Sequence, residues 1–258
     1  MREDLASFVE KWAERDPAIR LVLLFAPSRH RDAVGLWFAQ LRELEDAGLG
    51  RSSPQVAVAK LGFYAREFGS SAEAAHPLVR AWRERSAQRL GERLARELQQ
   101  LMEFSSVVSA EALHDRLRPW AQTAAEAADR LFGERLSTAA IAADFLCRRL
   151  HDLEAEAARG RLWLPLDLLA AEGLDRSALA GAGGNPPLAR VRARLARWWL
   201  ARLEVDGGPV QAVLSALARL RLEQIDRGRP ARWPPLRGLL RAWNAARSAR
   251  RRNETGNC

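Results

Sequence analysis

Residues 152–173, with the sequence DLEAEAARGRLWLPLDLLAAEG, decide how the whole chain is interpreted. An acidic, alanine-rich helix end is followed by a basic turn with a glycine, and then by an apolar segment interrupted by proline. Asp152 and Glu156 are four residues apart, so a helix places both carboxylates on one face, one turn apart. Two such carboxylates can share a hard divalent cation such as Mg²⁺. Arg159 and Arg161 follow directly, and their guanidinium groups can bind phosphate oxygens.

This stretch resembles the second Asp-rich motif of the squalene/phytoene synthase family. In that family a helix ends in two acids four residues apart, and an Ala-Arg-Arg-Gly-Arg-like turn and a Tyr-Leu-Pro follow. Here residues 158–165 read ARGRLWLP. The resemblance extends in element order over most of 20–240 and is specific over about 145–175. It implies an all-α fold, an isoprenoid-synthase-type helical bundle around a central cavity.

The first Asp-rich motif of the family is only partly kept. Residues 42–46 read RELED, similar to the Arg-Glu-Leu-Asp-Asp with which that motif begins. The first acid corresponds to Glu45, which borders the apolar stripe predicted for this helix. The second acid of the family lies four residues later, and here that position is Leu49. A carboxylate pair that has become Glu45 and Leu49 cannot bind a cation in the same way.

The resemblance also implies site residues. In the family, acid pairs on facing helices hold Mg²⁺, which neutralises the diphosphate so that it can leave. Apolar walls keep water away from the carbocation. On this basis Asp152 and Glu156 are expected metal ligands, together with Glu45 as a remnant of the first pair, and Mg²⁺ is needed only if the protein is active. No catalytic residue can be identified. The residues expected to bind substrate are Arg42, Arg148, Arg159, Arg161, Phe38 and Phe145.

The predicted helix over residues 138–159 allows two interpretations. One line of side chains is apolar at its start and ionic at its end, as in a tunnel with a polar mouth. The same ionic line could be a solvated face, because leucines lie on the opposite side. Arg148 can pair with Asp144 and with Asp152 at i,i+4 spacing. We hypothesise that this guanidinium partly replaces a lost metal ion, and tight Mg²⁺ binding at Asp152 and Glu156 would count against it. The line consists of Ile141, Phe145, Arg148, Asp152 and Glu156.

Spacing of apolar residues predicts helices along the whole chain, since Ala, Leu, Arg and Glu dominate. We expect one domain over residues 1–249 and a basic, disordered tail over 250–258. The predicted helices cover residues 3–14, 18–26, 29–47, 54–68, 77–103, 110–132, 138–159, 166–172, 188–204, 209–226 and 234–250.

Composition restricts the partners and the compartment. The 258 residues carry a net charge of +9, which attracts anionic partners. Nucleic acid is not expected, because no helix-turn-helix, zinc finger or aromatic-basic platform is recognisable. Two cysteines and the absence of a signal peptide or an apolar membrane span favour the cytoplasm. A peripheral membrane contact and a protein partner both remain compatible with the sequence.

Two functions compete. The favoured one is a diverged, non-catalytic member of the family that binds a prenyl diphosphate or isoprenoid lipid, or serves in assembly. A respiratory complex I assembly factor of the same superfamily shows a comparable loss of acids. The alternative is an active, Mg²⁺-dependent head-to-head prenyltransferase that joins prenyl diphosphates into a squalene- or phytoene-type product. The sequence leaves open whether the chain is an enzyme, because the second motif keeps its acid pair whereas the first has lost one acid.

Overall fold

A computed structural model describes residues 3–176, 185–204, 207–229 and 235–255, and within these ranges all regular structure is helical. The all-α fold is therefore confirmed. The elements in chain order are α1 (Glu3–Arg15), α2 (Pro17–Phe25), the 3-10 turn η1 (Ser28–His30), α3 (Arg31–Leu49), α4 (Pro54–Gly69), α5 (Pro77–Glu84), α6 (Gln88–Met102), α7 (Ala110–Phe132), α8 (Thr138–His151), α9 (Leu153–Ala158), α10 (Leu166–Ala170), α11 (Pro186–Leu200), α12 (Pro209–Asp226) and α13 (Pro235–Thr255).

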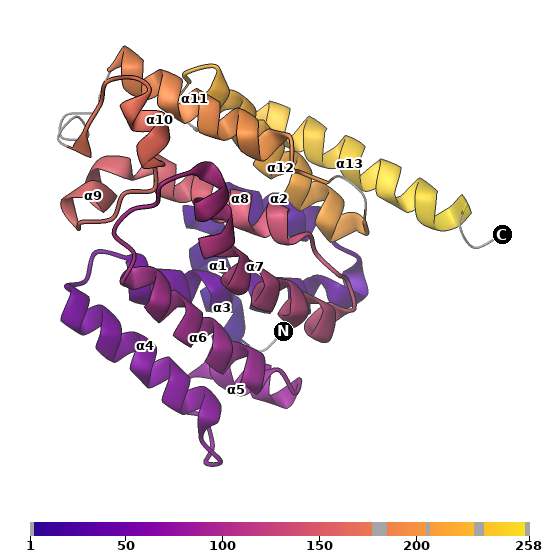
Figure 1. Cartoon of the computed structure of the whole chain (residues 1–258). Coiled ribbons are helices and arrows are strands. Elements are labelled where there is room, and N and C mark those ends of the chain that lie inside the picture. The colour runs from indigo at the N-terminus through magenta and orange to yellow at the C-terminus, as the bar shows by residue number, and fades with distance from the viewer. Residues whose placement is uncertain (1–2, 177–184, 205–206, 230–234, 256–258) are drawn as a thin grey trace.

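The helices pack as a bundle in which α3, α7 and α8 occupy the middle (Figure 1). On one side, α6 packs against α7 and is covered by α4. On the other side, α12 packs against α8 and carries α11 and α13 on its outer surface. The core between these layers holds large aromatic side chains with almost no exposed surface, which dominate its burial energy. They include Trp37, Trp82, Trp120, Trp163 and Trp199.

Two helices predicted as continuous are broken. The segment expected over residues 77–103 divides into α5 and α6 at Ser86, which adopts a φ of 56°. The segment expected over 138–159 divides at Asp152, whose φ of −100° and ψ of 28° end α8 before α9 begins. Neither break carries a proline or glycine, so apolar spacing alone gave no sign of it.

The C-terminal segment also differs from the prediction. Helix α13 continues to Thr255, so residues 250–255 are helical where a disordered tail was expected. Residues 256–258 of that tail lie outside the described residues. None of the helices described combines the length and apolarity that crossing a bilayer would need.

Candidate functional site

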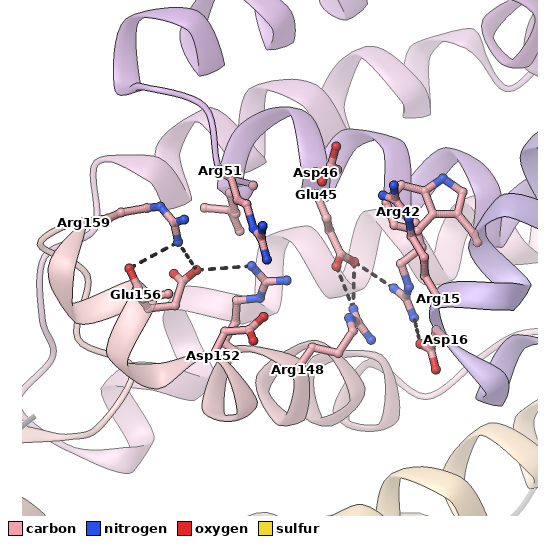
Figure 2. A pocket seen from close by; sticks show the side chains of 15 residues that line it. Arg15, Asp16, Arg42, Glu45, Asp46, Arg51, Arg148, Asp152, Glu156 and Arg159 are labelled. Atoms are coloured by element: carbon pink, nitrogen blue, oxygen red, sulfur yellow. Dashed lines mark hydrogen bonds and ion pairs between the residues drawn. The ribbon is translucent and has the colours of Figure 1, made fainter. Parts of the chain in front are cut away.

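A pocket of about 250 Å³ opens where α3 faces α8 and α9, near the end of α1 (Figure 2). Its lining is mainly ionic, with six arginines and five carboxylates. The arginines are Arg15, Arg42, Arg51, Arg148, Arg149 and Arg159, and the acids are Asp16, Glu45, Asp46, Asp152 and Glu156. The two predicted acidic motifs thus meet at one pocket, as the family resemblance implied.

At the pocket and extending behind it, three carboxylates and three guanidinium groups form a balanced cluster that we call the buried ion network, and four of its six members line the pocket. It brings together side chains from the start of α2, from α3, from α8 and from α12. Each of these side chains has at most 16% of its surface exposed. Because the charges are equal in number, each buried ion has an oppositely charged partner, which burial requires. The members are Asp16, Arg42, Glu45, Asp144, Arg148 and Arg221.

Glu45, the remnant of the first motif, is held by two arginines. Arg148 Nη2 donates to both carboxylate oxygens of Glu45 at 2.9 Å. Arg42 Nη1 donates to Oε1 at 2.9 Å. Figure 2 shows Glu45 pointing from α3 towards Arg148 on α8. Two guanidinium groups therefore bind the carboxylate of Glu45, and the metal-replacement hypothesis stays a prediction.

Asp144 lies at the centre of the buried ion network. Arg42 Nη2 donates to Oδ2 at 2.8 Å, Arg221 Nη1 donates to Oδ1 at 2.7 Å, and Arg148 forms an ion pair one turn along α8. Burial raises the pKa of Asp144, but the three arginines outweigh it and hold the pKa well below its ordinary value. Asp144 is thus ionised at neutral pH, and both of its carboxylate oxygens are paired with arginines.

Asp16 closes the network from the other end of the chain. Its side chain accepts from the backbone N–H of Ala18 and so caps α2. The same carboxylate accepts from Arg221 at 2.6 Å and from Arg42 at 3.4 Å. Burial raises the pKa of Asp16, but Arg221 and Arg42 reverse this and lower it. The carboxylate of Asp16 therefore serves both as the cap of α2 and as an ion-pair partner.

Glu156, from the second motif, is the centre of a separate group that we call the Glu156 cluster. Arg161 Nε and Trp163 Nε1 each donate to Oε2 at 2.8 Å. Arg149 and Arg159 approach Oε1 at 3.4 Å and 3.7 Å. Burial raises the pKa of Glu156, but these donors, led by Arg161, lower it overall. One carboxylate is thus surrounded by three arginines, which leaves positive charge in excess.

Arg161 also connects the two motifs. Its Nη2 lies 3.4 Å from the backbone oxygen of Leu49, the residue that stands where the family has its second acid. The side chain of Leu49 is itself buried. The end of α3 is therefore tied to the turn after α9 by a direct protein contact at this position.

The predicted pair of Asp152 and Glu156 does not act as a pair. Asp152 is exposed at the pocket, whereas Glu156 is 1% exposed and accepts hydrogen bonds within the Glu156 cluster. Among the described residues, Arg148 contacts Glu45 and Asp144 and does not reach Asp152, so only the first half of the expected ladder forms. The interpretation of the ionic line as a solvated face is wrong for Arg148, which points into the network.

The two predicted aromatic substrate contacts lie in the core instead of at the pocket. Phe145 is fully buried and packs against Trp120 and Trp163, with ring centroids 4.8 Å and 5.5 Å away. Phe38 is buried against Trp37 at 4.7 Å. Neither side chain lines the pocket. Both phenylalanines therefore pack against buried tryptophans of the core.

The residues at the pocket do not fit Mg²⁺ bound between the two motifs. Glu45 and Glu156 already accept hydrogen bonds from arginines, whose positive charge would repel a cation. In the part of the chain that the structure describes, no three His, Cys, Asp or Glu side chains are grouped so as to hold a metal ion. Asp46 and Asp152 are the exposed carboxylates of the lining.

Sequence reasoning missed several members of the two clusters. Arg221 lies between Leu220 and Leu222 on a largely buried helix, so a charge flanked by leucines was the available signal. Asp16 directly precedes Pro17 and was readable as a helix cap, but not as an ion-pair partner. Trp163 replaces a family tyrosine and gave no sign of bonding Glu156.

Comparison with known proteins identifies the family and the fold. A profile of the squalene/phytoene synthase family matches residues 13–205. A crystal structure of a dehydrosqualene synthase in complex with ligand aligns with a TM-score of 0.75 at 13% identity, over 98% of this chain and 97% of that chain. The squalene synthase HpnC from Alicyclobacillus acidocaldarius aligns with a TM-score of 0.55 at 19% identity, over 95% and 94%. A search of curated proteins gave no match.

At these identities the two structures establish the shared isoprenoid-synthase fold and nothing about substrate. The profile covers well over half of the sequence and includes both regions that resemble the family's acidic motifs. The chain belongs to the squalene/phytoene synthase family.

Proposed function

We propose that this chain is a non-catalytic family member that binds the diphosphate head of an isoprenoid lipid without Mg²⁺. The family binds prenyl diphosphates and is generally Mg²⁺-dependent. The observation that carries the proposal is the contact of Arg148 Nη2 with both carboxylate oxygens of Glu45, supplemented by Arg42. The proposal assigns to these two guanidinium groups the charge neutralisation that a metal ion supplies in the family, and side chains, unlike a metal ion, cannot leave with the product.

The remaining charge at the pocket supports an anionic ligand. Arg51 and Arg159 are exposed lining residues, and Figure 2 shows Arg51 extending from the end of α3 over the pocket. The Glu156 cluster adds positive charge that a single carboxylate does not balance. Arginine forks match phosphate geometry, so a diphosphate could bind here directly.

An active Mg²⁺-dependent head-to-head prenyltransferase is the second candidate. It is favoured by Asp46 and Asp152, two exposed carboxylates that line the same pocket from α3 and from the start of α9. These two acids, unlike Glu45 and Glu156, are not enclosed by arginines. Together they could recruit a cation once a diphosphate is present.

Ligand binding with and without metal separates the candidates. Farnesyl thiolodiphosphate, which ionises poorly, is titrated into the protein in EDTA and in Mg²⁺, and binding is followed by calorimetry and thermal unfolding. We expect similar binding in both buffers. Binding that needs Mg²⁺, together with product formation from farnesyl diphosphate, would establish the enzyme instead. No binding in either buffer would favour an assembly role with a protein partner.

Single arginine variants supply the matched control. Arg51→Gln should weaken the ligand about tenfold, because one charge-assisted contact of about 1.4 kcal/mol is lost. Arg118→Gln removes another exposed arginine, on α7, that does not line the pocket, and it should leave affinity unchanged. Equal effects of both substitutions would mean that the ligand responds only to net charge.

An isoprenoid ligand is itself a membrane lipid or a precursor of one. We therefore extend the proposal to a cytoplasmic protein that reaches its ligand at a membrane surface, as a peripheral rather than a spanning protein. Vesicle binding tests this extension separately from ligand binding in solution.

A further inference from the structure

Helix α13 has one buried face and one exposed face of unusual composition. Its buried face is made of small residues that pack on α12 and α2, namely Gly238, Ala242, Ala246 and Ala249. The exposed face begins with four large apolar side chains, Leu236, Leu239, Leu240 and Trp243. Leu236 is 75% exposed and Trp243 is 52% exposed. Their spacing of three and four residues places them on one stripe of the helix.

The second half of the same stripe is basic. Arg247, Arg250 and Arg251 continue the spacing from Trp243 and are exposed. Over its whole length α13 contains six arginines and a single acid, Glu254. The stripe therefore has an apolar half and a strongly positive half, and Figure 1 shows α13 on the outer side of α12, at the edge of the bundle.

Within the apolar half, Trp243 contacts a neighbouring helix. The ring of Trp243 meets Phe25 of α2 edge-on, with centroids 6.1 Å apart. Leu24, adjacent to Phe25 on the same helix, is 57% exposed. A hollow of about 290 Å³ beside Phe25 and Trp243 is bordered by Arg247, Arg250 and Arg251. Apolar contact area and positive charge thus adjoin on one surface.

We propose that this surface of α13, from Leu236 to Arg251, docks the protein on an anionic lipid bilayer. Leucine and tryptophan side chains can enter the boundary between head groups and acyl chains, while arginines meet lipid phosphates. Each basic residue near an anionic surface adds to the attraction. A second copy of this chain is a poorer occupant, because two faces with the same arginines repel one another. The proposal is independent of the pocket and of its ligand.

Vesicle sedimentation tests the proposal on the full chain. Vesicles of phosphatidylcholine alone are compared with vesicles that also contain phosphatidylglycerol. We expect binding to the anionic vesicles, weakened by salt, and little binding to phosphatidylcholine. Leu240→Ser with Trp243→Ser should weaken binding more than about tenfold. Arg247→Gln with Arg250→Gln should weaken it roughly tenfold or more, since each arginine contributes about fivefold.

The control variant carries Val56→Ser and Phe63→Ser, which remove a comparable exposed apolar pair on α4. It should bind vesicles as the unmodified protein does. Brominated lipids should quench fluorescence of the unmodified protein, and Trp243→Phe should remove much of that quenching. Thermal unfolding and light scattering of each variant exclude misfolding and report the oligomeric state.

Several results would overturn the proposal. They are no binding to anionic vesicles, equal binding to neutral ones, or equal losses in the α4 control. A dimer that becomes monomeric when Leu240 and Trp243 are replaced would assign the surface to a second copy. Retained vesicle binding with no affinity for farnesyl thiolodiphosphate would refute the ligand proposal alone, so the two failures are distinguishable.

Discussion

The buried ion network and the Glu156 cluster both contribute residues to one pocket, but they differ in charge balance. The network has equal numbers of acids and arginines, and two of its members, Asp144 and Arg221, do not line the pocket. The Glu156 cluster sets one carboxylate against three arginines, and Arg159 is exposed at the opening. We expect the balanced and largely buried cluster to stabilise the fold, whereas the unbalanced one, with an exposed arginine at the pocket, is suited to bind an anion.

Removing the central acid of the network should have the largest effect. Asp144→Asn leaves Arg42, Arg148 and Arg221 without the charge that three of their hydrogen bonds use. We expect a loss of about 3–5 kcal/mol in the free energy of unfolding, because breaking a buried ion pair leaves charge uncompensated. Urea unfolding measures it.

The exposed acid Asp152 provides the matched control for this prediction. Asp152→Asn should change the unfolding free energy by less than about 0.5 kcal/mol. Similar losses in the two variants would show that the network contributes no more to stability than a surface charge. The comparison between the two clusters would then lose its basis.

Acid should weaken the network next most strongly. The pKa values of Asp16 and Asp144 are lowered in the folded protein, so their stabilisation is complete above the ordinary carboxyl pKa of about 3.9 and is lost as the pH falls towards the folded values. A carboxylate of this kind contributes on the order of 2 kcal/mol. Unfolding free energies measured from pH 7 down to pH 3 should therefore fall more steeply in the unmodified protein than in Asp144→Asn. Parallel curves would contradict this origin of the pH dependence.

A smaller loss of stability than at Asp144 is expected at Glu156, together with tighter binding of an anion. Glu156→Gln keeps one oxygen for Trp163 or Arg161 and loses the charge, which should lower stability by about 1–3 kcal/mol. It also removes a negative charge from the pocket, so inorganic pyrophosphate should bind severalfold more tightly by calorimetry. Weaker pyrophosphate binding would mean that the Glu156 carboxylate positions the arginines rather than opposing the ligand.

Several features of the site follow from the sequence alone. The replacement of an acid by Leu49 predicted an incomplete metal clamp, which stays a prediction. The four-residue spacing of Asp152 and Glu156 predicted a carboxylate pair that the structure does not form, although residues of both motifs line one pocket. The i,i+4 pairing of Asp144 with Arg148 was also predictable, because it depends only on helical periodicity. The sequence likewise placed Glu45 at the edge of the buried face of its helix.

The sequence determined the helical fold, the family and the loss of one acid, because helical periodicity and motif spacing are local properties of the chain. Only the tertiary structure decided that Glu45 is occupied by Arg148 and Arg42, and that Arg221 bonds Asp16 across 205 residues. Periodicity shows which face of a helix a charge lies on but not which helix it meets. Ion pairs form between groups that packing brings within a few ångströms and shields from water, and no local pattern encodes that distance.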